Sequence, residues 1–287
     1  MTIGENLKKG VEKLRQSEIL DPVIKGRVIL AFVIGESKEY LVINQDKELS
    51  QDEIEKFEEA INRLVKGEPL QHITGKQEFM GMDFVVNKDV LIPRPDTEIL
   101  VEEVVEILSS MQNGTSIDDL TVLDLCTGSG AIAISIVNSV SNIKVLATDV
   151  SEEALKVARI NEINNYMDIS RIEFASSDLF EDIFEEFDLI VSNPPYIAKG
   201  EIEKLDVEVK REPMLALEAG VDGLDFYRKI ISEAYAYLRP NGYLCLEIGY
   251  NQRDDVIRVI NESEKYTDIY SKKDLAGNDR IVVCRRK

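Results

Sequence analysis

The sequence is poor in histidine, in cysteine and in positive charge, and each shortage excludes a class of protein. A single histidine, His72, excludes a histidine-rich metal site. Three cysteines, Cys126, Cys245 and Cys284, are spaced too widely for a disulfide framework or a Cys-x-x-Cys metal pair. This usage is typical of the reducing cytoplasm. We therefore predict a cytoplasmic protein without a metal centre.

Long uncharged apolar runs are also absent. No window approaches the roughly 18 apolar residues that a membrane-spanning helix needs, and the first residues lack the continuous apolar segment of a secretory signal. We expect neither secretion nor membrane insertion. The hydrophobic fraction of 44% is still large enough to build a proper core.

Basic residues are too few to balance the acidic ones. The chain has 34 Lys and Arg against 54 Asp and Glu, which gives a net charge of -20. Such a chain repels a phosphate backbone and gains nothing from counterion release. Tight binding of DNA or RNA is therefore not expected.

Two segments precede the main part of the chain. Residues 1–75 carry apolar residues at helical spacing, and Ser50 with Glu53 fits a capping box that starts a helix ending before Gly67. We predict a small helical bundle there. In residues 76–92 two apolar stretches flank Asn87-Lys88-Asp89, which predicts a β-hairpin linker with its turn at those three residues.

Residues 93–287 alternate between helical and strand patterns. Five apolar strand-like runs are separated by helical stretches, and two more close to the C-terminus suit an antiparallel edge. This order is typical of an α/β fold with a doubly wound, mostly parallel sheet and helices on both faces. The expected strands are 120–125, 143–147, 172–175, 187–191, 243–248, 266–271 and 280–284, which make a seven-stranded sheet.

The tetrapeptide Asn193-Pro194-Pro195-Tyr196 follows one of these strands, at the end where open α/β sheets bind ligands. Its prolines make a stiff turn that displays carbonyls and one carboxamide. The Asn193 side-chain oxygen and the Pro194 carbonyl can accept both hydrogens of an –NH2 group, while Tyr196 packs against a planar substrate. We predict a pocket for an amide or an exocyclic amine. Taken alone, the tetrapeptide also fits a plain strand-ending turn.

A glycine-rich loop follows the first strand and leads into an apolar helix. Small residues let a ligand approach the backbone, and the helix N-terminus offers donors. Because the loop also satisfies G-x-G-x-x-A, a dinucleotide site is an alternative. Acidic residues end the next two strands and suit ribose and adenine contacts, although Asp178 also fits a turn residue. The predicted cofactor-binding residues are Asp124, Cys126, Thr127, Gly128, Ser129, Gly130, Asp149, Asp178, Leu179 and Asn193.

These features converge on one crevice, and together they resemble the class I S-adenosylmethionine-dependent methyltransferases that act on an amide or amino nitrogen. Over essentially its whole length the chain is similar to the release factor glutamine methyltransferase (HemK/PrmC-like) family. The most discriminating segment is Leu91-Ile92-Pro93-Arg94-Pro95-Asp96-Thr97-Glu98. The resemblance implies a Rossmann-like methyltransferase domain with S-adenosyl-L-methionine as cofactor. At Cys126 the chain departs from the family, where glycine is more usual.

The resemblance also implies residue roles. Asn193, Pro194, Pro195 and Tyr196 are then the catalytic turn. Arg94, Thr97 and Glu98 are expected to shape the substrate site, with a hinge and helix start as the alternative. The long polar segment 197–223 is a candidate lid or an ordered excursion, and residues 1–75 are expected to dock the substrate protein.

The implied substrate is the glutamine of the Gly-Gly-Gln motif in peptide chain release factors, methylated on its side-chain amide nitrogen. Three alternatives remain from the residues themselves. A ribosomal protein glutamine uses the same pocket. Adenine or guanine amino groups in nucleic acid also suit an Asn-Pro-Pro-Tyr turn, although the net charge of -20 opposes that substrate. The third alternative is a nucleotide-binding module without activity.

Overall fold

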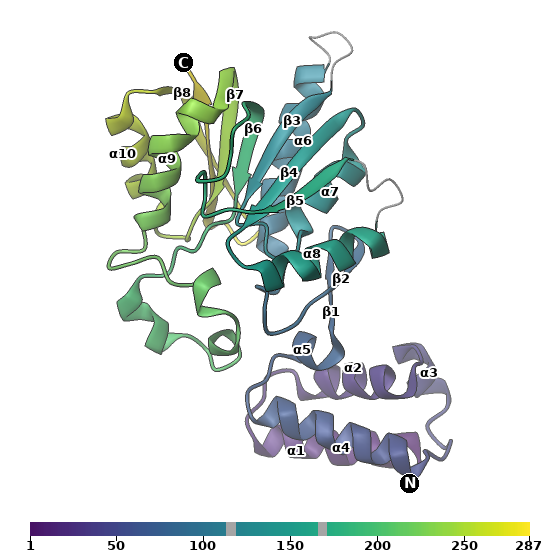
Figure 1. Ribbon diagram of the computed structural model, residues 1–287. Coiled ribbons are helices and arrows are strands. Elements are labelled where there is room, and N and C mark those ends of the chain that lie inside the picture. The colour runs from purple at the N-terminus through teal and green to yellow at the C-terminus, as the bar shows by residue number, and fades with distance from the viewer. Residues whose placement is uncertain (113–118, 166–170) are drawn as a thin grey trace. The chain divides into compact units, whose positions relative to one another are not determined.

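The computed structural model describes residues 1–112, 119–165 and 171–287, which divide into two compact units. Met1–Lys76 together with Asp206–Arg211 form the first unit, and Gln77–Leu205 together with Glu212–Lys287 form the second. Figure 1 shows the helices of the first and the twisted sheet of the second. Among the described residues, no helix has both the length and the apolar character needed to cross a bilayer.

The first unit is built from five helices of the described residues. They are α1 (Ile3–Gln16), α2 (Pro22–Ile34), α3 (Lys38–Ile43), α4 (Gln51–Val65) and α5 (Leu70–Thr74). The predicted capping box is confirmed: the Ser50 hydroxyl accepts the Glu53 amide while the Glu53 side chain accepts the Ser50 amide. Gly67, with φ of +81°, follows the end of α4 as expected. One apolar core unites these helices, with Leu14, Ile29, Leu30 and Leu64 fully buried.

The second unit has a seven-stranded sheet as its centre. The strands are β3 (Leu120–Leu125), β4 (Ile143–Asp149), β5 (Ile172–Ser176), β6 (Phe187–Ser192), β7 (Leu238–Glu247), β8 (Tyr266–Lys273) and β9 (Asp279–Arg286). Their order is β5-β4-β3-β6-β7-β9-β8, parallel throughout except for β9. The predicted doubly wound, mostly parallel fold with an antiparallel edge is therefore confirmed. Because the chain turns back from β5 to β6, the switch point lies between β3 and β6.

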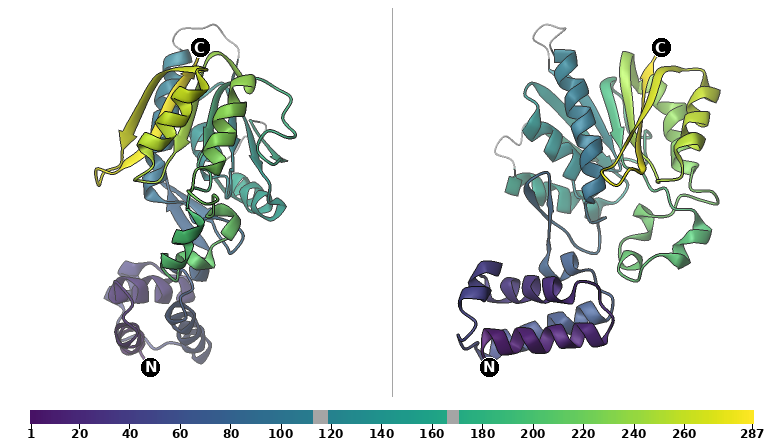
Figure 2. Two further views of the ribbon diagram at one scale, coloured as in Figure 1. Left: turned by 90° about the vertical axis from the view of Figure 1, so that its left-hand side faces the viewer. Right: turned by 180° about the vertical axis from the view of Figure 1, so that it is seen from behind.

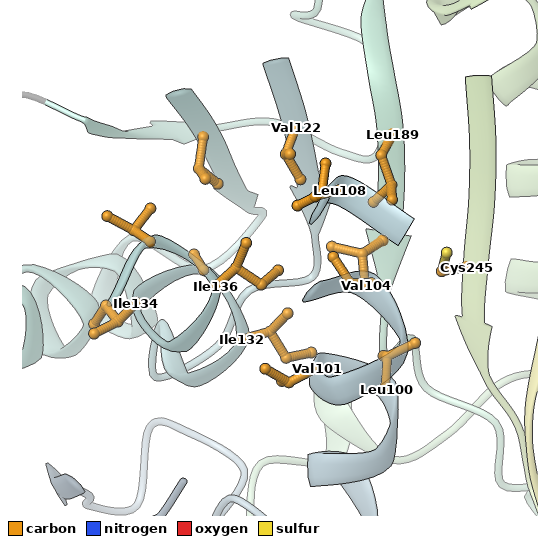
Figure 3. Close-up of a cluster of buried hydrophobic side chains, with 14 of the residues drawn as sticks. Leu100, Val101, Val104, Leu108, Val122, Ile132, Ile134, Ile136, Leu189 and Cys245 are labelled. Carbon is orange, nitrogen blue, oxygen red and sulfur yellow. The ribbon is translucent and has the colours of Figure 1, made fainter. Parts of the chain in front are cut away.

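Helices cover both faces of this sheet. They are α6 (Glu98–Gln112), α7 (Ala131–Ser139), α8 (Glu152–Asn165), α9 (Asp225–Tyr237) and α10 (Arg253–Ser263). Alternate residues of each strand point to opposite faces, so Val122 joins a core with α6 and α7, whereas Leu123 joins a core with α9 and α10. Figure 2 shows the two helical layers from other sides, and Figure 3 shows α6 and α7 side chains meeting β3 and β6.

The hairpin lies earlier in the chain than the sequence predicted. Its strands are β1 (Lys76–Phe79) and β2 (Met82–Val85), and its turn is Met80-Gly81, where φ is +51° and +73°. Two positive φ values in a two-residue loop match the twist of paired strands. The predicted turn at Asn87–Asp89 is wrong for a local reason: the Asn87 side chain accepts the Asp89 amide at 2.8 Å and makes an Asx turn outside the strands.

The remaining segment between β6 and α9 contains three short 3-10 helices. These are η2 (Lys199–Lys204), η3 (Val209–Arg211) and η4 (Met214–Ala216), and another, η1 (Pro95–Thr97), precedes α6. Glu212 ties the return of this segment to the second unit. Its carboxylate accepts the Ile92 amide at 2.9 Å and pairs with Arg94.

Candidate active site

The carboxyl ends of β3 and β6 bring the glycine-rich loop and the Asn-Pro-Pro-Tyr turn together. Leu125 pairs with Ser192 in parallel register, so Cys126 and Asn193 leave adjacent strands side by side. The Ser192 hydroxyl donates to the Leu125 carbonyl at 2.8 Å and fastens the two strand ends to each other. A pocket that is partly open to solvent lies over this edge, and the empty space in it, open solvent included, is about 730 Å³.

Seven of the predicted site residues line this pocket, and they come from four strand ends. They are Cys126, Gly128, Asp149, Asp178, Leu179, Asn193 and Pro195. The others support the wall instead. Asp124, Thr127, Ser129, Gly130, Pro194 and Tyr196 lie beneath or beside it, buried or half-buried. The structure therefore brings the glycine loop, the two acids and the turn into one site.

The glycine-rich loop is shaped by carboxylates. The Thr127 hydroxyl donates to buried Asp124 at 2.6 Å, and the Gly128 amide donates to Asp149 at 2.9 Å. Gly128 has φ of +57°, and a Cβ there would meet no protein atom within 4 Å, so the backbone faces open space. Gly130 has the opposite need: its Cβ would lie 3.1 Å from Ala158 on α8. One glycine exposes the backbone to a ligand and the other lets two helices approach.

The acids around the pocket have distinct environments. Burial raises the pKa of Asp124 to about 7, although hydrogen bonds from Thr127 and the Ala133 amide oppose this. Burial also raises the pKa of Asp149, whose oxygens accept the amides of Gly128 and Ser151 at 2.9 Å each. Each Asp149 oxygen retains a lone pair for a ligand hydroxyl. Asp178 is exposed at the pocket edge.

Asn193 carries the polar group that the pocket leaves unsatisfied. Its Nδ2 donates to the Thr97 hydroxyl oxygen at 3.4 Å, while its Oδ1 is buried and accepts no hydrogen bond. A buried acceptor without a donor costs free energy comparable to a lost hydrogen bond. Because Asn193 also lines the pocket, the missing donor is expected to come from a ligand.

Hydrogen bonds from Gln252 hold the backbone of Tyr196 and of the segment that follows it. The Gln252 side chain donates to the Tyr196 carbonyl at 2.9 Å and to the Gly223 carbonyl at 3.2 Å, and it accepts the Gly249 amide at 3.0 Å. The Tyr196 ring is half-buried against the core beneath α9. Burial and then the nearby Glu247 carboxylate raise the pKa of Tyr196, so its phenol stays neutral.

The residues predicted to shape the substrate site lie outside the pocket wall. Arg94 pairs with Glu212. Thr97 is buried and contacts Asn193. The Glu98 carboxylate accepts the Met80 amide at 2.7 Å and so caps the hairpin turn. The sequence therefore identified one segment, but its three side chains each contact a different part of the second unit.

Several site residues were not found from the sequence. Asp89 and Val90 line the pocket from the Asx turn, and Phe226 lines it from α9. Glu247 and Gln252 lie below it at the end of β7 and the start of α10. The polar turn at residues 87–89 could have located Asp89 and Val90, but it was predicted to be the turn of a β-hairpin. The described residues hold no group of three or more His, Cys, Asp or Glu side chains that could bind a metal.

The parallel sheet, the glycine loop and the Asn-Pro-Pro-Tyr turn at the carboxyl ends of the strands together define a methyltransferase of the doubly wound class. Known proteins then place the chain more closely. Residues 5–75 match the PrmC N-terminal domain, and residues 100–212 match the methyltransferase small domain. The chain is 38% identical over 290 residues to a release factor glutamine methyltransferase from Clostridium acetobutylicum, covering 100% of this chain and 99% of that one. It belongs to the release factor glutamine methyltransferase family.

Two further comparisons describe the range of similar proteins. A bifunctional methyltransferase from Rickettsia felis is 39% identical over 98% of this chain, which spans 58% of that longer protein. The solved hMettl16 catalytic domain, in complex with the MAT2A 3'UTR hairpin 6, superposes with a TM-score of 0.57 at 15% identity, covering 90% of this chain and 92% of that one. At that identity the likeness concerns the fold.

S-adenosyl-L-methionine is the cofactor of this methyltransferase family, and the residues present fit it. The open backbone at Gly128 suits a close approach, and Asp149 offers acceptors for the two ribose hydroxyls. Leu179, which is buried and lines the pocket, would offer an apolar wall to the adenine ring. Asn193 also lines the pocket, at the strand end next to the one that carries Cys126.

Proposed function

We propose that this protein transfers the methyl group of S-adenosyl-L-methionine to the side-chain amide nitrogen of the glutamine in the Gly-Gly-Gln motif of peptide chain release factors. Family membership supports the reaction class. The observation that carries the proposal is the buried Asn193 Oδ1, which lines the pocket and has no hydrogen-bond donor. A glutamine –NH2 group supplies that donor. We also propose a cytoplasmic location, where release factors act.

Orientation is the chemical problem that this site solves. An amide nitrogen is a poor nucleophile because its lone pair is delocalised into the carbonyl group. S-adenosyl-L-methionine, when bound, supplies a sulfonium-activated methyl group. The Asn193 Oδ1 and the Pro194 carbonyl accept the two hydrogens of the substrate amide and direct its nitrogen to the methyl carbon. The same acceptors stabilise the positive charge that develops on nitrogen.

The proline pair makes these acceptors rigid. Pro194 and Pro195 are both buried, and their rings fix φ, so the backbone of the turn has little freedom to rearrange. The Gln252 contacts to the Tyr196 carbonyl hold the other end of the turn. Preorganised acceptors need no reorganisation during the reaction, which is the main source of their catalytic effect.

Methylation of defined substrates tests this proposal. Purified protein is incubated with methyl-labelled S-adenosyl-L-methionine and, separately, a release factor, the same factor with its Gly-Gly-Gln glutamine changed to alanine, ribosomal proteins and bulk nucleic acid. We expect label on the glutamine of the release factor and none on the alanine variant, as located by peptide mass. Label on a ribosomal protein or only on nucleic acid would overturn the substrate assignment.

Replacing the proposed acceptor tests the residue assignment. We expect Asn193→Ala to lower kcat by about 100-fold or more, as for the loss of one preorganised polar contact. Asn138→Ala, an exposed asparagine on α7, is the matched control and should keep the wild-type rate. A rate for Asn193→Ala within about twofold of wild type would exclude Asn193 as the amide acceptor.

A further inference from the structure

One buried asparagine on α8 joins two of the segments that form the pocket. Asn161 is fully buried and does not itself line the pocket. Its Nδ2 donates to the Ser129 carbonyl at 2.9 Å and to the Val85 carbonyl at 3.0 Å, and its Oδ1 accepts the Val85 amide at 2.6 Å. Both hydrogens of the carboxamide are therefore used. The proposed reaction leaves this residue without a role.

The contact with Ser129 fixes the glycine-rich loop. Ser129 follows Gly128, which lines the pocket and has its backbone open to a ligand. The peptide group between Ser129 and Gly130 is held on both sides, because its carbonyl accepts Asn161 and its amide donates to the Thr127 carbonyl at 2.9 Å. This peptide group cannot rotate without breaking both hydrogen bonds. Asn161 therefore holds the first wall of the pocket in one conformation.

The contacts with Val85 fix the start of a second wall. Val85 ends β2, which runs beside α8 (Figure 1), and the Asn161 carboxamide bonds both of its backbone groups as a neighbouring strand would. The chain continues from there to Val90, which lines the pocket. Val90 is buried in a small cluster with Ala154 and Val157 of α8. The stretch after β2 therefore packs on the same helix that holds the glycine-rich loop.

We propose that Asn161 is a positioning residue for the cofactor, which sets the spacing of two walls of the S-adenosyl-L-methionine pocket by bonding to Ser129 and Val85 at once. A carboxamide suits this role because it is planar and carries donors and an acceptor together. Walls that are fixed before binding lose less conformational freedom when the cofactor binds, so their fixation favours affinity. The inference goes beyond the proposed function, since it concerns the cofactor whatever the methyl acceptor is.

Calorimetric titration with S-adenosyl-L-methionine, without a methyl acceptor and well below the melting temperature, tests this role. We expect Asn161→Leu, which is close in size but has no polar group, to raise Kd by about tenfold or more, because binding must then order both walls. The matched control is Asn165→Ala, one turn further along α8. The Asn165 Nδ2 donates to the Asp83 carbonyl of β2 at 2.8 Å, and so contacts the hairpin without the glycine-rich loop. This variant should keep Kd within about twofold of the wild type.

The stoichiometry of binding separates positioning from a loss of folded protein. A variant that only folds less completely binds less cofactor per chain at an unchanged Kd, whereas misplaced walls raise Kd at the wild-type stoichiometry. We expect the second result for Asn161→Leu. A Kd within about twofold of the wild type, with or without a lower stoichiometry, would overturn the inference. An equal rise of Kd in Asn165→Ala would overturn it as well, because the link to the glycine-rich loop would then be irrelevant.

Hydrogen exchange in the wild type gives a test that needs no variant to fold. Because Asn161 links the two walls, saturating cofactor should slow the exchange of the Val85 amide by about fivefold or more, as followed in a ¹⁵N-resolved NMR spectrum. The control is the Glu53 amide of the first unit, which also donates to a side chain, the Ser50 hydroxyl at 3.3 Å, and should not respond. An unchanged rate for Val85 would overturn the inference. If these results hold but no release factor is methylated, the proposed substrate fails while the role of Asn161 stands.

Discussion

At the scale of single residues, the pocket stores backbone strain. Cys126 has φ of +61° and Leu179 has φ of +52°, and both line the pocket. The left-handed region costs a non-glycine residue about 1–2 kcal/mol. Glycine at either position would not have this cost. Burial also raises the pKa of the Cys126 thiol, which favours its protonated form.

Substitutions at Cys126 should separate strain from space. We expect Cys126→Gly to keep cofactor binding, because glycine adopts positive φ readily. Cys126→Val adds a β-branched side chain at a positive φ and should lower the free energy of unfolding by about 2 kcal/mol. Urea unfolding and titration with S-adenosyl-L-methionine measure both effects. Equal stability of the two variants would show that the backbone at residue 126 carries no strain.

The buried Asp124 makes a second residue-scale prediction, on stability against pH. Its native pKa of about 7 is above its ordinary value of 3.8, so between those pH values the native state holds a proton that the unfolded state has lost. Stability from this group is therefore present at low pH and falls as the pH rises toward 7. We expect the melting temperature of Asp124→Asn, relative to that of the wild type, to be higher at pH 8 than at pH 4. An equal difference in melting temperature at both pH values would contradict the assignment.

At the scale of elements, Gln252 joins three segments that end at the site. One carboxamide holds the backbone after β6, the end of the long segment before α9, and the turn after β7. Close packing leaves little room there, because a Cβ at Gly223 would lie 2.5 Å from the Tyr196 carbonyl oxygen. The position of the Asn193–Tyr196 turn, proposed above to be catalytic, therefore depends on contacts between segments as well as on its own prolines.

Removing that carboxamide should affect both stability and rate. We expect Gln252→Leu to lower the free energy of unfolding by about 2–3 kcal/mol, because it leaves buried backbone groups unsatisfied. The kcat should also fall, since the Tyr196 end of the turn loses its anchor. Gln51→Leu, at an exposed position on α4, is the control and should change stability by less than about 0.5 kcal/mol. If Gln252→Leu is destabilised but keeps a normal kcat, Gln252 contributes to stability and not to the rate of reaction.

At the scale of the whole molecule, charge is the feature that bears on substrate choice. A net charge of -20 disfavours nucleic acid and favours a partner with a basic surface. We therefore expect kcat/KM for an intact release factor to fall by about tenfold as salt rises from about 50 to 300 mM, because screening removes long-range attraction. A short Gly-Gly-Gln peptide is the control and should show a weaker dependence. Identical salt dependence for both substrates would exclude electrostatic steering.

The sequence by itself determined the features that depend on neighbours along the chain. Apolar runs and their spacing predicted the seven strands and the doubly wound order, because burial requires that pattern. The capping box at Ser50 and the placement of Asn193 after a strand followed from local chemistry as well. Local signals also misled once, where an Asx turn at Asn87 resembled the turn of a hairpin.

Only the tertiary structure decided which side chains meet. The segment Arg94–Glu98 was recognised as a unit, yet Arg94 pairs with Glu212, Thr97 contacts Asn193, and Glu98 caps the hairpin. Thr97 and Asn193 are 96 residues apart. Glu247 shows no distinctive pattern in the sequence, and only the fold buries its carboxyl group at the end of β7. Local patterns set the elements, whereas the contacts between distant side chains depend on which elements the sheet brings together.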